Sequence, residues 1–221
     1  EAALKNEISE DLIESVNKVL EDVDIEYLEK EIPEAIEQTL EGVGRVSDIV
    51  RSMKEFSHPG GQEKTVVNIN HNIENTITVS RNEWKYISNM ETDLAPSLPL
   101  VPCLPGEINQ VFLNLIINAS HAIADVVGDG SKGKGKIKIS TREVDGFVEI
   151  RISDTGTGIP EGIRDKIFDP FFTTKGVGRG TGQGLPMARS VIVNKHNGSI
   201  RFESQIGKGT TFIIRLPLKE G

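Results

Sequence analysis

One stretch of the chain decides how the rest is interpreted, and it reads Asp154-Thr155-Gly156-Thr157-Gly158-Ile159-Pro160. It directly follows the alternating run 147–153, which predicts a strand that ends at the aspartate. The two glycines let the chain turn where a side chain would collide with something close by. A plain tight turn capped by Asp154 would look alike, so these residues alone favour a ligand loop and a turn about equally.

The composition is that of a folded protein with one large domain or two small ones. The 221 residues are 37% hydrophobic and 26% charged, which excludes wholesale disorder. No apolar run approaches the roughly 20 residues that span a bilayer, and the N-terminus does not resemble a signal peptide. The single cysteine, Cys103, excludes an internal disulfide and a multi-cysteine metal site. We therefore expect a reducing, cytoplasmic setting and no membrane contact by this part of the chain, even if a longer parent protein is membrane-anchored.

Charge is distributed unevenly along the chain. Residues 1–57 hold 16 acidic and 6 basic side chains, a net charge of −10, and the remainder has a net charge of +2. An acidic segment beside a nearly neutral one argues against nucleic-acid binding, which needs a basic face.

The first 57 residues are predicted to be helical. Apolar residues recur at three- and four-residue spacing in two stripes, within 4–20 and within 25–56. Asp22 and Asp24 favour a turn and a helix N-cap between them. Such helices are not stable alone in water, so we expect a helical hairpin that packs in a bundle, either as a dimerisation device or as the remnant of a longer bundle.

This helical hairpin, called the arm below, is expected to end at a domain boundary. Pro33 should kink the second helix, unless that helix begins nearer Ile32. His58-Pro59-Gly60-Gly61 stops the helix, which predicts domains at 1–60 and 61–221.

The second domain mixes strands and helices in an irregular order. Its hairpins are antiparallel, so we expect the α+β class, with one mixed sheet backed by helices. The predicted strands are 65–69, 86–94, 136–142, 147–153, 199–204 and 210–217, and the predicted helices are 73–80, 107–127, 161–168 and 185–196.

Two asparagines stand out in the long predicted helix. Asn114 and Asn118 are four residues apart and share one face, with His121 adjacent and Gln110 a turn earlier. Asparagine is a mediocre helix former, so its presence among Leu and Ile needs a reason. The asparagines either satisfy neighbouring backbone groups or place an amide oxygen to bind a hard cation such as Mg²⁺ together with phosphate oxygens.

A glycine-rich segment follows three aromatic anchors. The anchored part is Phe168-Asp169-Pro170-Phe171-Phe172-Thr173-Thr174-Lys175, and glycines then occupy 176, 178, 180, 182 and 184. A helix is predicted to begin at the far end, where amide N–H groups favour an anion, and Lys175 and Arg179 add positive charge. A disordered surface loop would not explain the anchors. We expect a lid that closes over a polyphosphate.

Together these stretches resemble the N, G1, F, G2 and G3 boxes of sensor histidine kinases, in the ATPase superfamily that includes gyrase, Hsp90 and MutL. The resemblance covers about residues 64–218 and implies a two-layer α/β sandwich, with helices on one face of a mixed sheet, preceded by the helical hairpin arm. The matching motifs, in order, are Asn114-Leu-Ile-Ile-Asn118-Ala, Asp154-Thr-Gly-Thr-Gly158, Phe168-Asp-Pro-Phe-Phe-Thr-Thr-Lys175, Gly180-Thr-Gly-Gln-Gly184-Leu and Gly207-Lys-Gly-Thr210.

The resemblance also implies roles for individual residues. Asp154 would accept a hydrogen bond from the adenine amino group, Gly156 and Gly158 would let the backbone approach the purine, and Asn118 would coordinate Mg²⁺. The implied catalytic residues are Asn114, Asn118, His121 and Lys175. The implied ATP-binding residues are Asn118, Ala122, Asp154, Gly156, Gly158, Ile159, Phe168, Thr173, Thr174, Lys175, Gly180, Thr181, Gly182, Gln183, Gly184, Leu185 and Thr210.

One position separates kinases from ATPases within this superfamily. The hydrolysing members have a Glu general base where this chain has Asn114, which cannot accept a proton at neutral pH. The resemblance therefore implies slow hydrolysis and transfer of the phosphoryl group to a histidine of the bundle, then to an aspartate of a response-regulator receiver domain.

The chain lacks the acceptor in its expected context. His58, His71, His121 and His196 all stand in other surroundings, so we expect the acceptor histidine to lie outside this chain and autophosphorylation of this chain alone to fail. In the full protein we expect a homodimer formed through the arm. The alternatives are a serine kinase of the same superfamily and an ATP-binding regulatory or scaffold module without kinase activity.

Overall fold

The structure is a computed structural model that describes residues 9–23, 25–56, 63–131, 133–174 and 181–219. The chain divides into two compact units, Glu1–Asp48 and Ile49–Gly221, each of which is described by itself. The predicted boundary at 58–61 lies outside the described residues and stays a prediction.

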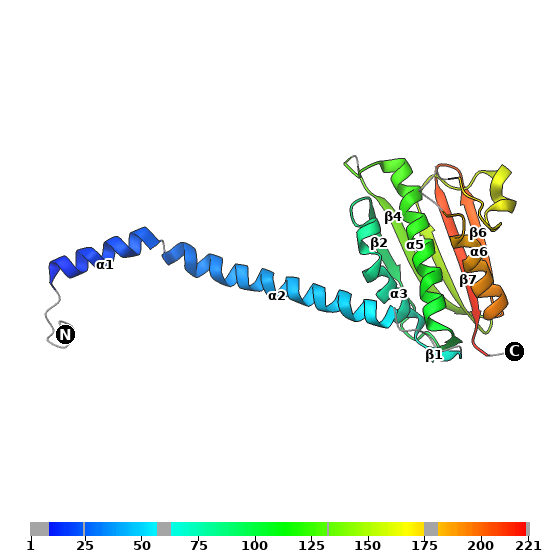
Figure 1. Cartoon of the computed structure of the whole chain (residues 1–221), viewed down its shortest axis with the longest axis horizontal. Coiled ribbons are helices and arrows are strands. Elements are labelled where there is room, and N and C mark those ends of the chain that lie inside the picture. The colour runs from blue at the N-terminus through cyan, green and yellow to red at the C-terminus, as the bar shows by residue number, and fades with distance from the viewer. Residues whose placement is uncertain (1–8, 24, 57–62, 132, 175–180, 220–221) are drawn as a thin grey trace. The chain divides into compact units, whose positions relative to one another are not determined.

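The predicted two-helix arm is present as α1 (Glu10–Val23) and α2 (Ile25–Phe56) (Figure 1). Because α2 begins at Ile25 and contains Pro33, the alternative start near Ile32 is wrong. The large apolar side chains of α1, from Leu12 to Leu20, are between 44% and 57% exposed. An amphipathic helix with its apolar stripe in water needs a partner, as the sequence pattern indicated.

The second unit is built on a mixed five-stranded sheet with strand order β2-β4-β5-β7-β6. β2 is parallel to β4 and the other neighbours are antiparallel. Figure 1 shows the helices on one side of this sheet, which confirms the predicted α+β class. The strands are β2 (Ser88–Asp93), β4 (Gly135–Val144), β5 (Phe147–Asp154), β6 (Ser199–Gln205) and β7 (Gly209–Pro217).

The long helix α5 (Pro105–Val127) packs against the sheet with its apolar residues. Pro105 stands in the first turn, where no intrahelical N–H bond is lost, so the helix begins two residues earlier than predicted. By length and mean hydropathy α5 could span a membrane. Its apolar side chains, among them Val111, Phe112 and Leu115, are instead buried in the core. A core helix passes the same test, which makes it weak evidence for a span.

The helix α3 (Ile69–Val79) begins four residues before its predicted start. The Asn68 side chain accepts a hydrogen bond from the His71 N–H at 3.2 Å and caps the first turn. The short α4 (Arg81–Trp84) follows. The sequence-based prediction missed this cap and hence the first turn of the helix.

A second, two-stranded sheet corrects the prediction of a single sheet. Its strands, β1 (Thr65–Val67) and β3 (Val101–Cys103), pair antiparallel, with Val66 opposite Pro102. This part of the chain carries four prolines between 96 and 105, and no strand was predicted between 94 and 107. β3 nevertheless forms there, because proline is tolerated in an edge strand where its missing N–H would face outward.

The helices on either side of the glycine-rich segment also differ from prediction. A 3₁₀ helix, η1 (Glu161–Lys166), replaces the short helix expected at 161–168. The single helix expected at 185–196 is α6 (Gly184–Arg189) followed by a π-helix, η2 (Ser190–Lys195). The wider turn leads to His196, a buried residue whose ring nitrogens contact Val191 O at 2.7 Å and Leu104 N at 2.9 Å.

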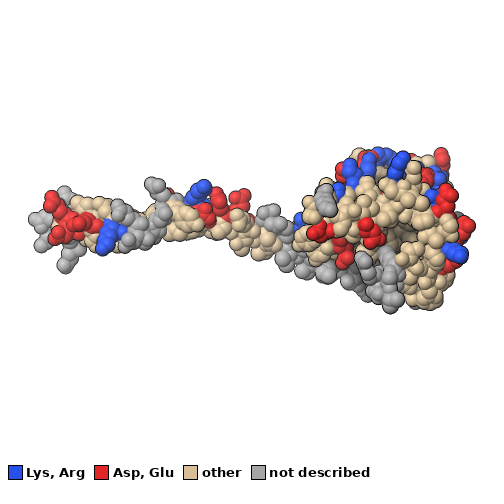
Figure 2. All heavy atoms as spheres, turned by 90° about the horizontal axis from the view of Figure 1, so that it is seen from above, with Lys and Arg blue, Asp and Glu red and all other residues tan. Residues whose placement is uncertain are grey.

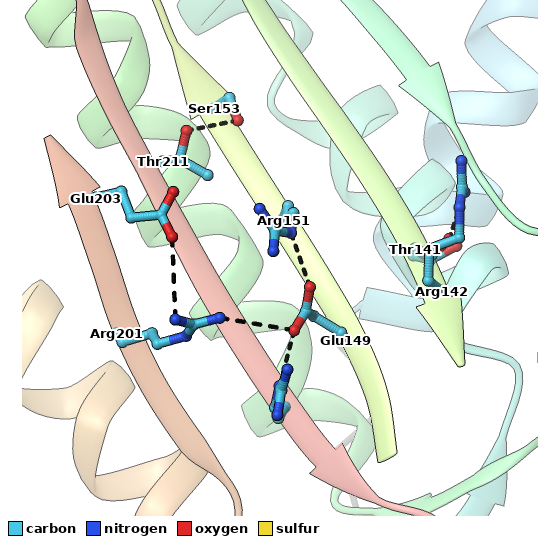
Figure 3. Close-up of polar contacts among 9 residues, drawn as sticks. Thr141, Arg142, Glu149, Arg151, Ser153, Arg201, Glu203 and Thr211 are labelled. Atoms are coloured by element: carbon cyan, nitrogen blue, oxygen red, sulfur yellow. Dashed lines mark hydrogen bonds and ion pairs between the residues drawn. The ribbon is translucent and has the colours of Figure 1, made fainter. Parts of the chain in front are cut away.

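The sheet face opposite the helices is covered by its own charged side chains. Glu149 lies beside Arg151 and Arg201 (Figure 3), and its carboxylate oxygens lie 2.7 Å from the Nε atoms of Arg151 and Arg215. Ile213 pairs with Arg151 on one side and Arg201 on the other and is fully buried. The arginine stems shield this apolar side chain while their guanidinium groups pair with the carboxylate.

Seen from above, Lys and Arg gather along one side of the second unit and are interspersed with Asp and Glu (Figure 2). This mixed charge agrees with the nearly neutral net charge of the second unit's sequence.

Candidate functional site

Asp154 is the last residue of β5 and lies half-buried at the end of the sheet. Its Oδ1 accepts hydrogen bonds from the N–H groups of Gly156 at 2.8 Å and Thr210 at 3.2 Å. Burial raises the pKa of this carboxyl above its ordinary value, and the two N–H groups only partly offset that effect. Neither bond uses Oδ2, so the backbone fixes one oxygen of the carboxylate and leaves the other for a further interaction.

The two glycines of the loop 154–160 are required by the protein's own backbone. A Cβ on Gly156 would lie 2.6 Å from the carbonyl carbon of Ala122, and a Cβ on Gly158 would lie 2.3 Å from the Gln205 carbonyl oxygen. Gly158 also has a φ of 75°. The predicted crowding is therefore confirmed, with α5 and the end of β6 as the crowding partners; the approach of these glycines to a purine stays a prediction.

Further backbone contacts hold the same loop on both sides. The Thr157 N–H donates to Ala122 O at 3.2 Å, and Thr157 O accepts from the Gly207 N–H at 2.8 Å. The loop is thus held between α5 and the turn that joins β6 to β7.

A serine that the sequence reasoning missed joins this loop to the closing hairpin. The Ser204 Oγ accepts from the Ile159 N–H at 2.8 Å and lies 2.9 Å from the Thr210 Oγ1. Ser204 shares the inner face of β6 with Ile200 and Phe202. That alternation was the available signal, because a hydroxyl on a core-facing position needs partners.

The asparagines of α5 lie on the face that meets the loop and the far end of the glycine-rich segment. The Asn114 Oδ1 accepts from Gln110 Nε2 at 3.2 Å, and its Nδ2 donates to Gly184 O at 3.4 Å. Asn114 thus satisfies a neighbouring backbone group, which is the first of the two roles that the sequence suggested for these asparagines. Asn118 and His121 are half-buried on the same helix, close in sequence to Ala122, which packs against Gly156.

The two described ends of the predicted lid meet at its base. The Phe171 N–H donates to Gly182 O at 3.0 Å, while the Phe171 side chain is 72% exposed. Phe168 and Phe172 pack against the hydrophobic core, and Phe168 also lies 5.5 Å from the Arg189 guanidinium. Phe168 and Phe172 therefore anchor the segment as predicted, whereas the exposed Phe171 side chain does not, which corrects the prediction of three aromatic anchors.

The remaining predicted lid residues differ in exposure. Thr173, Thr174, Thr181 and Gln183 are exposed, and Leu185 packs against the core. Lys175 and Gly180 lie outside the described residues, so their predicted roles remain predictions.

Two further features bear on where a ligand would bind. In the described part of the chain, no group of three or more His, Cys, Asp and Glu side chains could hold a metal ion. A hollow of about 480 Å³ lies between η1, η2 and β6 and is lined by Arg164, Phe168, Arg189 and Phe202 among others. Of the predicted site residues that the structure describes, Phe168 alone lines it, so this hollow does not coincide with the loop at Asp154.

The second unit contains the part of the chain that matches a known protein family. Residues 104–220 match the family described as histidine kinase-, DNA gyrase B-, and HSP90-like ATPase. The signal transduction histidine-protein kinase AtoS of Escherichia coli (strain K12) is 33% identical over 191 residues, which cover 84% of this chain and 29% of AtoS. The sensor kinase CckA of Brucella abortus (strain 2308) is 39% identical over 127 residues, covering 51% of this chain and 12% of CckA.

A solved structure agrees with the fold. The nucleotide-free catalytic domain of histidine kinase ThkA superposes with a TM-score of 0.61 at 32% identity, covering 71% of this chain and 97% of that domain. The chain spans less than a third of the length of either sequence relative.

Proposed function

Because the chain belongs to the family of histidine kinase-, DNA gyrase B- and HSP90-like ATPases, we propose that it transfers the γ-phosphoryl group of ATP to a histidine outside this chain. It contains the ATP-binding catalytic region of a histidine kinase. We further propose that an aspartate on a response-regulator receiver domain takes the phosphoryl group from that histidine.

The observation that carries this proposal is the way Asp154 is held. Two backbone N–H groups bind its Oδ1, so the free Oδ2 is available to accept a hydrogen bond from the amino group of adenine. Guanine and hypoxanthine carry a carbonyl oxygen at that position and would face the carboxylate with a lone pair. A site built on buried polar groups discriminates strongly against a ligand that leaves them unpaired.

The phosphates would lie along α5 and under the lid. Asn118 offers an amide oxygen, and we propose that Mg²⁺ binds there together with the phosphate oxygens of the nucleotide, which suits a cation that takes few protein ligands. Bound Mg²⁺ would neutralise charge on the transferred phosphoryl group. His121, Lys175 and the lid residues from Thr173 to Leu185 would contact or cover the phosphates.

The side chain of Asn114 directs the phosphoryl group away from water. Its amide cannot accept a proton and is engaged with Gln110 and with the Gly184 carbonyl. An attacking water would find no general base at this position. A histidine ring nitrogen needs none to attack: it bonds to the γ-phosphorus as the bond to the β–γ bridging oxygen breaks and ADP leaves. We expect hydrolysis of ATP alone to stay below about one turnover per minute.

The helical arm supports the rest of the proposal. Its exposed apolar stripe needs other helices, and we propose that the full protein forms a homodimer through it and presents the acceptor histidine on the same bundle. We propose that this region lies in the cytoplasm, where ATP is available, and that it contacts neither nucleic acid nor membrane.

Transfer in trans tests the proposal. The chain is mixed with a separate bundle fragment that carries an acceptor histidine, and with Mg²⁺ and γ-labelled ATP. We expect label on that histidine, and much less label at limiting ATP when Asp154→Ala replaces the parent chain. Tight ATP binding without any transfer would instead support the regulatory or scaffold module, and label on a serine would support a serine kinase.

A further inference from the structure

We propose that Ser204 is a positioning residue for base recognition: its hydroxyl joins the loop 154–160 to Thr210 and thereby holds Asp154 in the orientation that selects adenine. This inference rests on the proposed function of Asp154. Ser204 itself would not touch the nucleotide.

The hydrogen bonds of the hydroxyl admit one arrangement that satisfies every partner. A serine hydroxyl has one hydrogen and two acceptor positions. The Ile159 N–H at 2.8 Å can only donate to it, and the Gly209 carbonyl at 3.1 Å can only accept from it. The Thr210 hydroxyl at 2.9 Å must then be the second donor. The capacity of Ser204 is therefore filled by three groups from the two segments that flank Asp154.

Both segments act directly on the carboxylate. Thr210 donates its backbone N–H to Asp154 Oδ1 and its hydroxyl to Ser204, so the same residue binds Asp154 and Ser204. Ile159 lies in the loop whose Gly156 N–H is the other donor to Oδ1. Arg164 braces the junction from outside, since its Nη2 donates to Ser204 O at 2.8 Å and its Nε to Ile159 O at 3.3 Å.

Removal of the hydroxyl would release both supports at once. Ser204→Ala leaves the Ile159 N–H without its acceptor and frees the Thr210 hydroxyl, so Asp154 loses its fixed orientation. The three hydrogen bonds of the Ser204 hydroxyl are lost together, which weakens the one hydrogen bond between Asp154 and the base, and we expect ATP affinity to fall about tenfold. ITP carries a carbonyl oxygen in place of the amino group, so its affinity should change little.

The ratio of ATP to ITP affinity separates positioning from general loosening. Calorimetry with Mg²⁺ is performed on the full chain and on Ser204→Ala, Ser204→Thr and Ser153→Ala. We expect Ser204→Ala to lower the ratio about tenfold and Ser204→Thr, which keeps a hydroxyl, to restore it. Ser153→Ala is the matched control: it removes the 2.9 Å hydroxyl pair with Thr211 on the neighbouring strands, on the opposite face of the sheet (Figure 3), and should leave the ratio unchanged.

Equal losses of ATP and ITP affinity in Ser204→Ala, or an unchanged ratio, would overturn the proposal. Asp154→Asn distinguishes this failure from failure of the proposed function, because its amide should reverse the preference towards ITP. If Asp154→Asn leaves the ratio unchanged, the base-recognition role of Asp154 is wrong. Should Ser204→Ala fail to fold, Thr210→Val removes the other hydroxyl but keeps the backbone N–H, and an unchanged ratio in that variant would overturn the proposal equally.

Discussion

Two carboxylates on the same strand, β5, illustrate opposite uses of a buried charge. Asp154 lies at the strand end on the inner face and is held by backbone N–H groups, and burial raises its pKa. Glu149 lies on the outer face; burial acts to raise its pKa too, but hydrogen bonds and charge from Arg151 and Arg215 outweigh burial and lower it.

The difference shows which carboxylate is available to a ligand. Arginines occupy both oxygens of Glu149, so it ties neighbouring strands together and pairs with the arginines whose stems shield Ile213. Burial and two backbone N–H groups, rather than a cation, determine the pKa of Asp154, and its Oδ2 is not used by the two N–H donors. A buried carboxylate that is only partly satisfied, next to a loop held on both sides, is typical of a binding group.

The largest expected effect is the loss of ATP affinity when Asp154, on the inner face of β5, is replaced. Asp154→Ala should lower ATP affinity by about 10- to 100-fold, because a hydrogen bond to a charged group contributes about 1.5–3 kcal/mol. Calorimetry measures the affinity and circular dichroism verifies the fold. Glu149→Ala is the contrasting variant and should bind ATP normally while it remains folded. A normal affinity in Asp154→Ala would contradict the site assignment.

Replacement of Glu149, on the outer face of β5, should instead lower the stability of the fold. Glu149→Ala leaves Arg151, Arg201 and Arg215 close together without their shared carboxylate, and we expect the free energy of unfolding to fall by about 2 kcal/mol. Urea denaturation measures this change. Glu203→Ala removes an exposed carboxylate that lies 3.9 Å from Arg201, and should cost about 0.5 kcal/mol or less. Equal losses of stability in the two variants would show that burial of Glu149 does not increase its contribution to the free energy of unfolding.

The smallest expected effect is a difference in pH dependence between the roles of the two carboxylates. Burial raises the pKa of Asp154, so its ionised form is lost at a higher pH than that of an ordinary carboxyl. We propose that this form accepts a hydrogen bond from the adenine amino group, so ATP affinity should fall in mildly acidic solution. Glu149 has a lowered pKa, so its stabilising contribution is full above the ordinary value of 4.5 and disappears only as the pH falls through the lower folded value.

Calorimetry and urea denaturation over the same pH range test this order. We expect ATP affinity to decline before the Glu149-dependent part of the stability does. Asp154→Asn should lack the acid decline in ATP affinity, and a decline that persists in that variant would assign it to another group.

Local sequence patterns were sufficient for most of the sheet, and they marked the candidate site. Alternation placed β4, β5, β6 and β7 within a few residues, because a one-residue shift would turn each apolar set away from the core. Polar residues where apolar ones were expected, such as Asn114 and Asp154, marked the candidate site. The patterns failed where a distant partner decides the outcome: β3 forms because β1 lies beside it, and the π-helix η2 leads to His196, which contacts Leu104.

The sequence by itself determined the α+β class and the family and marked Asp154 as the centre of the candidate site, because each depends on residue types at fixed local spacing. Only the tertiary structure decided what the neighbours of that aspartate do. Gly156 and Gly158 are glycines because Ala122 and the Gln205 carbonyl lie against them, and Ser204 matters because Ile159 and Thr210 meet at its hydroxyl. Apart from the Ser204–Thr210 pair within the closing hairpin, those contacts join residues about 30 to 50 positions apart, and local spacing carries no information about a partner at that separation.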